Sequence, residues 1–123
     1  MPMNLHLVCK DRLSIRRIAG TTDRYETGDW VVATATADQC VGGSLFLHDR
    51  QRSPSYHGGC VLRWYRASGE EPSARIVFVY RHMPDHSQVS AGREGWSQEI
   101  KLVETSPRLG QPNQPVVPRL GQV

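Results

Sequence analysis

Large apolar side chains recur at every second position between residues 74 and 82, and this spacing constrains the fold more than any other feature. In an extended segment, one face would carry Ile76, Phe78 and Tyr80, and the opposite face would carry Arg75 and Arg81. A period of two residues is typical of a half-buried strand in an antiparallel sheet. The segment therefore predicts a fold built mainly from β-strands with one buried face.

Further segments of β-type composition fill much of the chain. They are residues 5–9, 30–35, 44–48, 60–64 and 96–104, separated by turn signals at Gly28-Asp29, 68–72 and 90–95. Thr36-Ala37-Asp38-Gln39 has the form of a capping box and Gly42-Gly43 follows it, which predicts a short helix over residues 36–41. Residues 11–19 suit either a second short helix or an irregular arm. About six strands with one or two short helices predict a small closed or partly open β-barrel.

The 123 residues suffice for one domain, which we place at residues 3–105. The remainder, 106–123, contains Pro-Arg-Leu-Gly-Gln twice, with further prolines between the copies. Because proline removes a backbone donor and fixes φ, this segment is predicted to be a disordered or polyproline-like tail. It is either a peptide ligand for an adaptor function or an extension without a selected role.

Composition argues against several classes of protein. No apolar run approaches the roughly 20 residues that span a bilayer, and Lys10-Asp11-Arg12 interrupts the first apolar segment too early for a secretion signal. We therefore expect a cytoplasmic protein without membrane association. Cys9, Cys40 and Cys60 are widely spaced and odd in number, which disfavours a disulfide framework or a structural zinc site and predicts buried, inert thiols.

Arginine dominates the basic residues. The chain has 13 Arg and 2 Lys against 12 acidic residues, for a net charge of +3. Five bases and two acids lie between Lys10 and Arg24, and further arginines flank the segment 51–59: Arg50, Arg52, Arg63 and Arg66. Guanidinium groups suit phosphate recognition, so this clustering indicates a nucleic-acid partner. The alternative is a solvated surface without a ligand.

The segment 51–59 has an unusual composition for the approach to a strand. Gly58-Gly59 lacks side chains, so a ligand or another strand could come close to this backbone. Nearby hydroxyls, rings and guanidinium groups form a set that can hold a base and its phosphates: Arg50, Arg52, Ser53, Ser55, Tyr56 and His57. Trp30 and Tyr56 are the candidate stacking walls, whereas Trp64 and Trp96 are expected in the core. A β-bulge or corner would explain the glycines without a ligand.

Catalytic and metal sites have weaker signals. His82-Met83-Pro84-Asp85-His86 could supply metal ligands, with His48 or His57 as a third, but Pro84 prevents the helix that would align an i, i+4 pair. We interpret this segment as a polar loop and predict no metal and no cofactor. Ser53 or Ser55 with His57 lacks a nucleophile elbow. A small-molecule binder or metal-assisted enzyme that uses the histidines is the alternative function.

The order of elements resembles the PUA-like superfamily, in particular its EVE, ASCH and YTH relatives. The resemblance covers residues 28–103 and depends on three features: the strand from Trp30 with its short helix, Gly42-Gly43 before the strand 44–48, and Gly58-Gly59 before an apolar strand. It implies a pocket that binds RNA or a modified base, in RNA or DNA. On this chain the implied pocket contains Trp30, His48, Ser53, Ser55, Tyr56 and His57. Neither the Gly-x-Lys-x-x-Glu motif of ASCH domains nor the aromatic cage of YTH domains is present.

Overall fold

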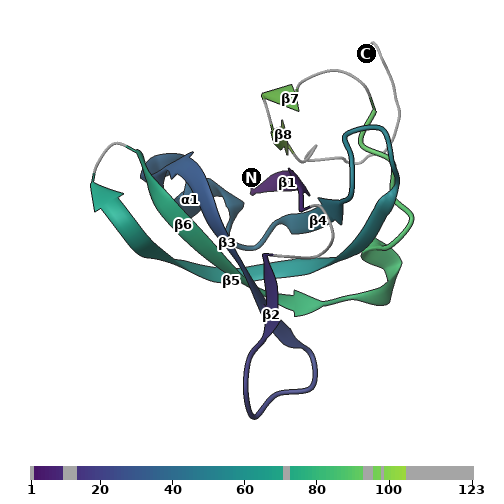
Figure 1. The fold of residues 1–123 in the computed structure, drawn as a ribbon, viewed down its shortest axis with the longest axis horizontal. Helices are drawn as coiled ribbons and strands as arrows, with labels where there is room; N and C mark the ends of the chain where they lie inside the picture. Colours follow the sequence, from purple (N-terminus) through teal and green to yellow (C-terminus); the bar gives the residue numbers. More distant parts are fainter. Residues whose placement is uncertain (1, 10–13, 71–72, 93–95, 98, 105–123) are drawn as a thin grey trace.

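The computed structural model describes residues 2–9, 14–70, 73–92, 96–97 and 99–104. The predicted tail, 106–123, and the start of the ambiguous segment at residues 11–13 lie outside the described residues. Most of the described chain is extended, which confirms the prediction of a mainly β fold (Figure 1).

Eight strands and two short helical segments follow one another along the chain. They are β1 (Met3–Val8), β2 (Ile15–Arg17), β3 (Arg24–Ala33), α1 (Thr34–Cys40), β4 (Ser44–His48), β5 (Ser55–Glu70), β6 (Ser73–His82), the 3₁₀ turn η2 (Pro84–His86), β7 (Trp96–Ser97) and β8 (Ile100–Glu104). The six strands that the sequence predicts are all present in part. The additional two are the edge strand β2 and the division of residues 96–104 into β7 and β8.

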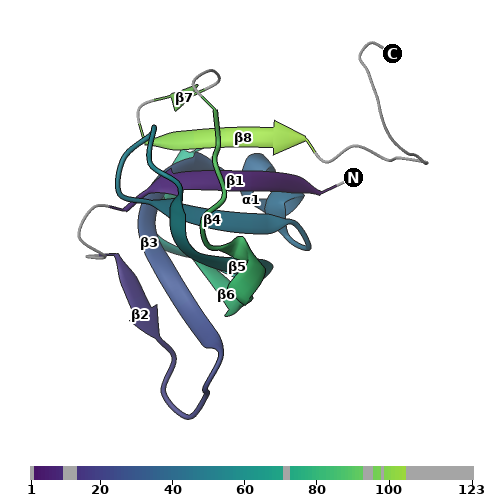
Figure 2. The same cartoon turned by 90° about the vertical axis from the view of Figure 1, so that its right-hand side faces the viewer.

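The eight strands form a single mixed sheet in the order β2-β3-β6-β5-β4-β1-β8-β7. β1 pairs in parallel with β4, and Leu5 lies opposite Leu45. The other pairs that involve the described strands are antiparallel. Figure 2 shows β4, β1 and β8 side by side, with the β2–β3 hairpin extending away from them. The strand β6 lies between β3 and β5, and its residues 76–80 are buried on both faces.

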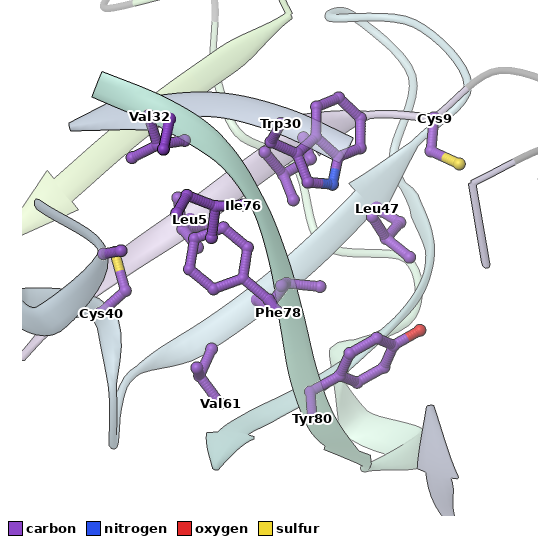
Figure 3. Close-up of a cluster of buried hydrophobic side chains, with 14 residues drawn as sticks. Leu5, Cys9, Trp30, Val32, Cys40, Leu47, Val61, Ile76, Phe78 and Tyr80 are labelled. Atoms are coloured by element: carbon purple, nitrogen blue, oxygen red, sulfur yellow. The ribbon is translucent and has the colours of Figure 1, made fainter. Parts of the chain in front are cut away.

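The core lies on the inner face of this curved sheet. β1 and β3 are separated in the sheet by β6, β5 and β4, yet their buried side chains belong to the same cluster. Figure 3 shows Trp30, Leu47 and Phe78 directed toward this common interior. Ala37 and Cys40 of α1 are fully buried in the same cluster. Each large apolar side chain buried here contributes roughly 1.5–3 kcal/mol of transfer free energy.

The helix α1 begins two residues earlier than the capping box predicts. β3 ends at Ala33, which pairs with Ser73, and the helix starts directly at Thr34. Ala33 is the N-cap and makes no side-chain capping hydrogen bond, so Thr36 lies inside the helix. The predicted cap is therefore wrong, because the end of the β3–β6 pairing sets the start of the helix.

The segment 96–104 is not one strand, as its alternation predicts, but two. Trp96 lies opposite Lys101 and Ser97 opposite Ile100, so β7 and β8 form a tight hairpin. Trp96 consequently lies beside the rings of His6 and His48 rather than in the core, at centroid distances of 6.4 and 5.8 Å. Trp64 is also not fully buried, and its indole donates to Asp38 Oδ1 at 2.9 Å.

All three cysteines are free thiols. Cys9 and Cys40 are buried as predicted, whereas Cys60 is only half-buried. Within the ranges that the structure describes, no helix has the length and apolarity required to cross a bilayer.

Candidate nucleic-acid interface

Arginines gather on the outer face of the β2-β3-β6-β5 half of the sheet. Residues opposite one another in an antiparallel pair point to the same face, and the register places several charged residues opposite the core face. They are Arg16 on β2, Arg24 and Glu26 on β3, Arg75 and Arg81 on β6, and Arg63 on β5. All five arginines are exposed. We call this set of five arginines the arginine face.

At one end of the arginine face, two cations occupy directly opposite positions on neighbouring strands. Arg24 is the register partner of Arg81, and Arg63 is the partner of Val79, one step along β6 on the same face. Like charges directly opposite on neighbouring strands destabilise a sheet. Within the described part of the chain, none of these three arginines forms an ion pair, although Arg63 lies close enough to Glu26 to lower the pKa of that carboxyl. The exposed guanidinium groups of Arg24 and Arg81 are therefore available to an anion.

One carboxylate on this face is already neutralised. Glu26 accepts a hydrogen bond from Arg16 Nε at 2.8 Å and another from the Tyr65 hydroxyl at 2.7 Å. The hydrogen bond from Tyr65, followed by the contact with Arg16, lowers the pKa of Glu26. The Arg63 guanidinium lies 5.9 Å from the centroid of the Tyr65 ring. The network fixes the Tyr65 ring among guanidinium groups, an arrangement suited to stacking a base beside phosphates.

The loop residues that the sequence predicts as a ligand site lie elsewhere. Arg50 and Arg52 are exposed and line a hollow of about 500 Å³ together with Gln51 and Gly92. The carbonyl of Ser53 accepts a hydrogen bond from Nδ1 of the buried His48 at 2.7 Å. These four predicted residues are thus near neighbours: the two arginines are exposed, Ser53 is half-buried and His48 is buried.

His48 forms part of a buried histidine pair. Because its Nδ1 donates to a carbonyl, its Nε2 in the neutral ring is an acceptor. His6 Nδ1, 2.8 Å away, must then carry a hydrogen and donate to it. Burial lowers the pKa of both rings, and that of His6 falls to about 4. His48 is therefore a neutral structural residue at physiological pH.

The polar residues at the start of β5 bond to other parts of the protein. Ser55 is buried, and its hydroxyl donates to His86 O at 2.6 Å and accepts from Val89 N at 2.9 Å. The Tyr56 hydroxyl donates to the Cys9 carbonyl. His57 Nδ1 lies 2.8 Å from the Tyr80 hydroxyl. The structure thus uses these three predicted residues to attach β5 to its neighbours.

Gly58 and Gly59 lie within β5 rather than before it, and neighbouring protein atoms occupy the space beside them. A Cβ on Gly58 would come within 2.1 Å of the Leu45 carbonyl oxygen and 3.2 Å of His86 Cβ. A Cβ on Gly59 would lie 1.8 Å from the Arg81 carbonyl oxygen. The glycines permit close approach of the protein's own strands.

The structure places Trp30 in the core. Its side chain is 6% exposed in the core, and its Nε1 donates to Thr27 Oγ1 at 3.2 Å. The hollow that Trp30 lines is formed with β8 residues, including Ile100 and Leu102. Tyr56, the other stacking wall that the sequence predicts, is not among the residues that line this hollow and packs partly buried against the core.

The five histidines divide into two clusters. The Phe46 ring stacks on His6 and on His86 at centroid distances of 4.6 and 4.8 Å, and His48 lies beside His6. His57 and His82 stack on each other at 4.1 Å beside Tyr25. Among the residues with described positions, no group of three or more His, Cys, Asp or Glu side chains could hold a metal.

Comparisons with protein-family models, with curated proteins and with solved structures find no match to this chain.

Sequence reasoning missed the arginine face, although part of the signal was present. The alternation in 74–82 already places Arg75 and Arg81 opposite the core face. The missing information was the partner strand: β3 begins at Arg24, six residues before the predicted start, and this extension brings Arg24 next to Arg81.

Proposed function

We propose that this protein is a small nucleic-acid-binding module that holds single-stranded RNA or DNA on the arginine face. The observation that carries the proposal is the direct opposition of Arg24 and Arg81 on neighbouring strands, with Arg63 close by and no carboxylate paired to them in the described structure. A phosphate between two guanidinium groups would convert this repulsion into attraction, and guanidinium groups form bidentate hydrogen bonds to phosphate.

Tyr65 favours a single strand over a duplex. Its ring is half-buried and held from one side by Glu26, so it is oriented before any ligand arrives. Stacking on an aromatic side chain requires an unpaired base, and such contacts contribute roughly 1–3 kcal/mol per base. The combination of an oriented ring with surrounding cations is the usual chemistry of single-strand recognition.

The proposal includes a PUA-like, partly open barrel as the scaffold. Two observations support it. The core cluster takes side chains from strands far apart in the sheet order. In addition, residues from β3 and β8, near the two ends of that order, line one hollow of about 470 Å³. A sheet that curves until its ends face each other has the form of a barrel with an open seam.

Fluorescence anisotropy with labelled RNA and DNA oligonucleotides tests the function. We expect salt-sensitive binding, and the double variant Arg24→Gln/Arg81→Gln should bind at least about tenfold more weakly with a salt slope smaller by about 2. The matched control is Arg50→Gln/Arg52→Gln, which removes the same charge from the loop and should bind nearly as tightly as the wild type.

Two results would refute the assignment. One is the absence of salt-sensitive binding by the wild type at low ionic strength. The other is wild-type affinity in the Arg24/Arg81 variant. If the Arg50/Arg52 variant also loses binding, the binding site lies on the loop that carries Arg50 and Arg52. Since both variants replace exposed side chains, urea unfolding should show stability within about 1 kcal/mol of the wild type.

A further inference from the structure

A hollow of about 370 Å³ opens beside the arginine face. It is lined by Ser14, Ile15, Arg16, Glu26, Gly28, Asp29 and Val77. Its volume lies within the roughly 300–1,000 Å³ range of small-ligand pockets. Gly28 allows the β3 backbone to pack closely on Val77, since a Cβ there would come within 2.6 Å of Val77 Cγ2. Val77 is also the register partner of Tyr65, so the hollow adjoins the ring that is proposed to stack bases.

The two carboxylates of this hollow differ in their partners. Glu26 is occupied by Arg16 and Tyr65. Asp29 is exposed and forms no hydrogen bond or ion pair with any residue whose position is described. A free carboxylate next to a phosphate-binding surface repels the phosphate backbone. It is compatible with nucleic-acid binding if it accepts hydrogen bonds from a base, as acidic side chains do from exocyclic amino groups.

We propose that this hollow is a guanine pocket in which Asp29 reads the Watson–Crick edge of an unpaired base. This inference rests on the proposed single-strand binding and adds its base preference. Guanine presents two adjacent donors, N1–H and N2–H, that match both oxygens of one carboxylate. Adenine and cytosine place a ring acceptor next to the amino group, and uracil has a single N–H between two carbonyls. The half-buried Ile15 supplies apolar surface for a face of the base, and the buried Val77 also lines the hollow.

The test compares RNA nonamers that differ at one position. The probes are oligo(U) with a central G, A, C or U, and a fifth carries inosine, which lacks the N2 amino group. We expect the G probe to bind about tenfold more tightly than the A, C and U probes, with inosine in between. Asp29→Asn replaces one acceptor oxygen by a donor and should abolish this preference while leaving binding to the U probe unchanged or tighter. The matched control is Asp23→Asn, an exposed acid outside the hollow, which should keep the preference.

The outcomes separate this inference from the proposed function. Equal, salt-sensitive binding of all five probes overturns the guanine pocket and leaves the arginine face in place. A guanine preference that survives Asp29→Asn also overturns it. If no probe binds, the proposed function fails and the pocket assignment fails with it.

Discussion

The buried pair of His6 and His48 should make this protein markedly less stable in mild acid. Burial is the main cause of the low pKa of His6, about 4 in the folded protein against 6.5 for an ordinary histidine, and His48 and Lys101 lower it further. The unfolded chain therefore binds the proton more readily than the folded one. The stability that the neutral ring provides is complete above pH 6.5 and is lost as the pH falls from 6.5 toward 4.

The magnitude follows from linkage. Each unit of pKa difference corresponds to about 1.4 kcal/mol, so at about pH 5, where the unfolded His6 is protonated and the folded His6 is mostly neutral, the loss is about 2 kcal/mol. His48, whose pKa is also lowered by burial, changes stability in the same direction. Urea unfolding followed by tryptophan fluorescence at about pH 7.5 and pH 5 measures the difference. In His6→Asn, whose side-chain amide can still donate to His48 Nε2, this difference should shrink by about 2 kcal/mol.

Phe78→Leu is the matched control, because it weakens the core on the other face of the sheet without removing a titrating group. It should lower the free energy of unfolding by a similar amount at both pH values. If His6→Asn loses as much unfolding free energy between pH 7.5 and pH 5 as the wild type, protonation of His6 does not cause that loss, and the reasoning is wrong.

Two further predictions concern other parts of the core. Gly59→Ala should cost at least about 3 kcal/mol, because its Cβ would meet the Arg81 carbonyl oxygen at 1.8 Å and backbone cannot move aside cheaply. Urea unfolding against Ser68→Ala, an exposed position on β5, checks this, and equal stability of the two variants would contradict it. Burial raises the pKa of Cys40 to about 11, so iodoacetamide at about pH 8 should label this thiol only after unfolding. Mass spectrometry of native and urea-treated protein measures the labelling, and rapid modification of the native thiol would count against this burial.

Much of the fold can be predicted from the sequence where the determinants are local. Ile76, Phe78 and Tyr80 alternate on a strand that is paired on both sides, so periodicity identifies the strand and its core face, although Val77 and Val79 on the opposite face are buried as well. The turn signals at 68–72 predict the β5–β6 connection, although β5 continues to Glu70 and Gly69, which has a positive φ, pairs with Ala74. Local sequence also indicates α1, although its first turn depends on where the β3–β6 pairing ends.

The candidate site depends on contacts between distant segments, and the sequence does not specify these. The hydroxyls and rings of 53–57 resemble a ligand site because their partners, such as His86 and Tyr80, lie more than twenty residues away. Once these partners are in place, the residues are occupied by structural hydrogen bonds. Conversely, Arg24 has no special local context and gains its significance only from its position opposite Arg81.

The position of β1 has a consequence for biosynthesis. Its backbone is hydrogen-bonded to β4 on one side and to β8 on the other. β1, the earliest described strand to leave the ribosome, can therefore pair on both of its edges only after β8 has also been synthesised. Pairings of such long sequence separation are slow to form. A nascent chain stalled before residue 100 would carry β1 with one unprotected edge, and fusion partners or truncations that delay β8 should favour aggregation at that edge.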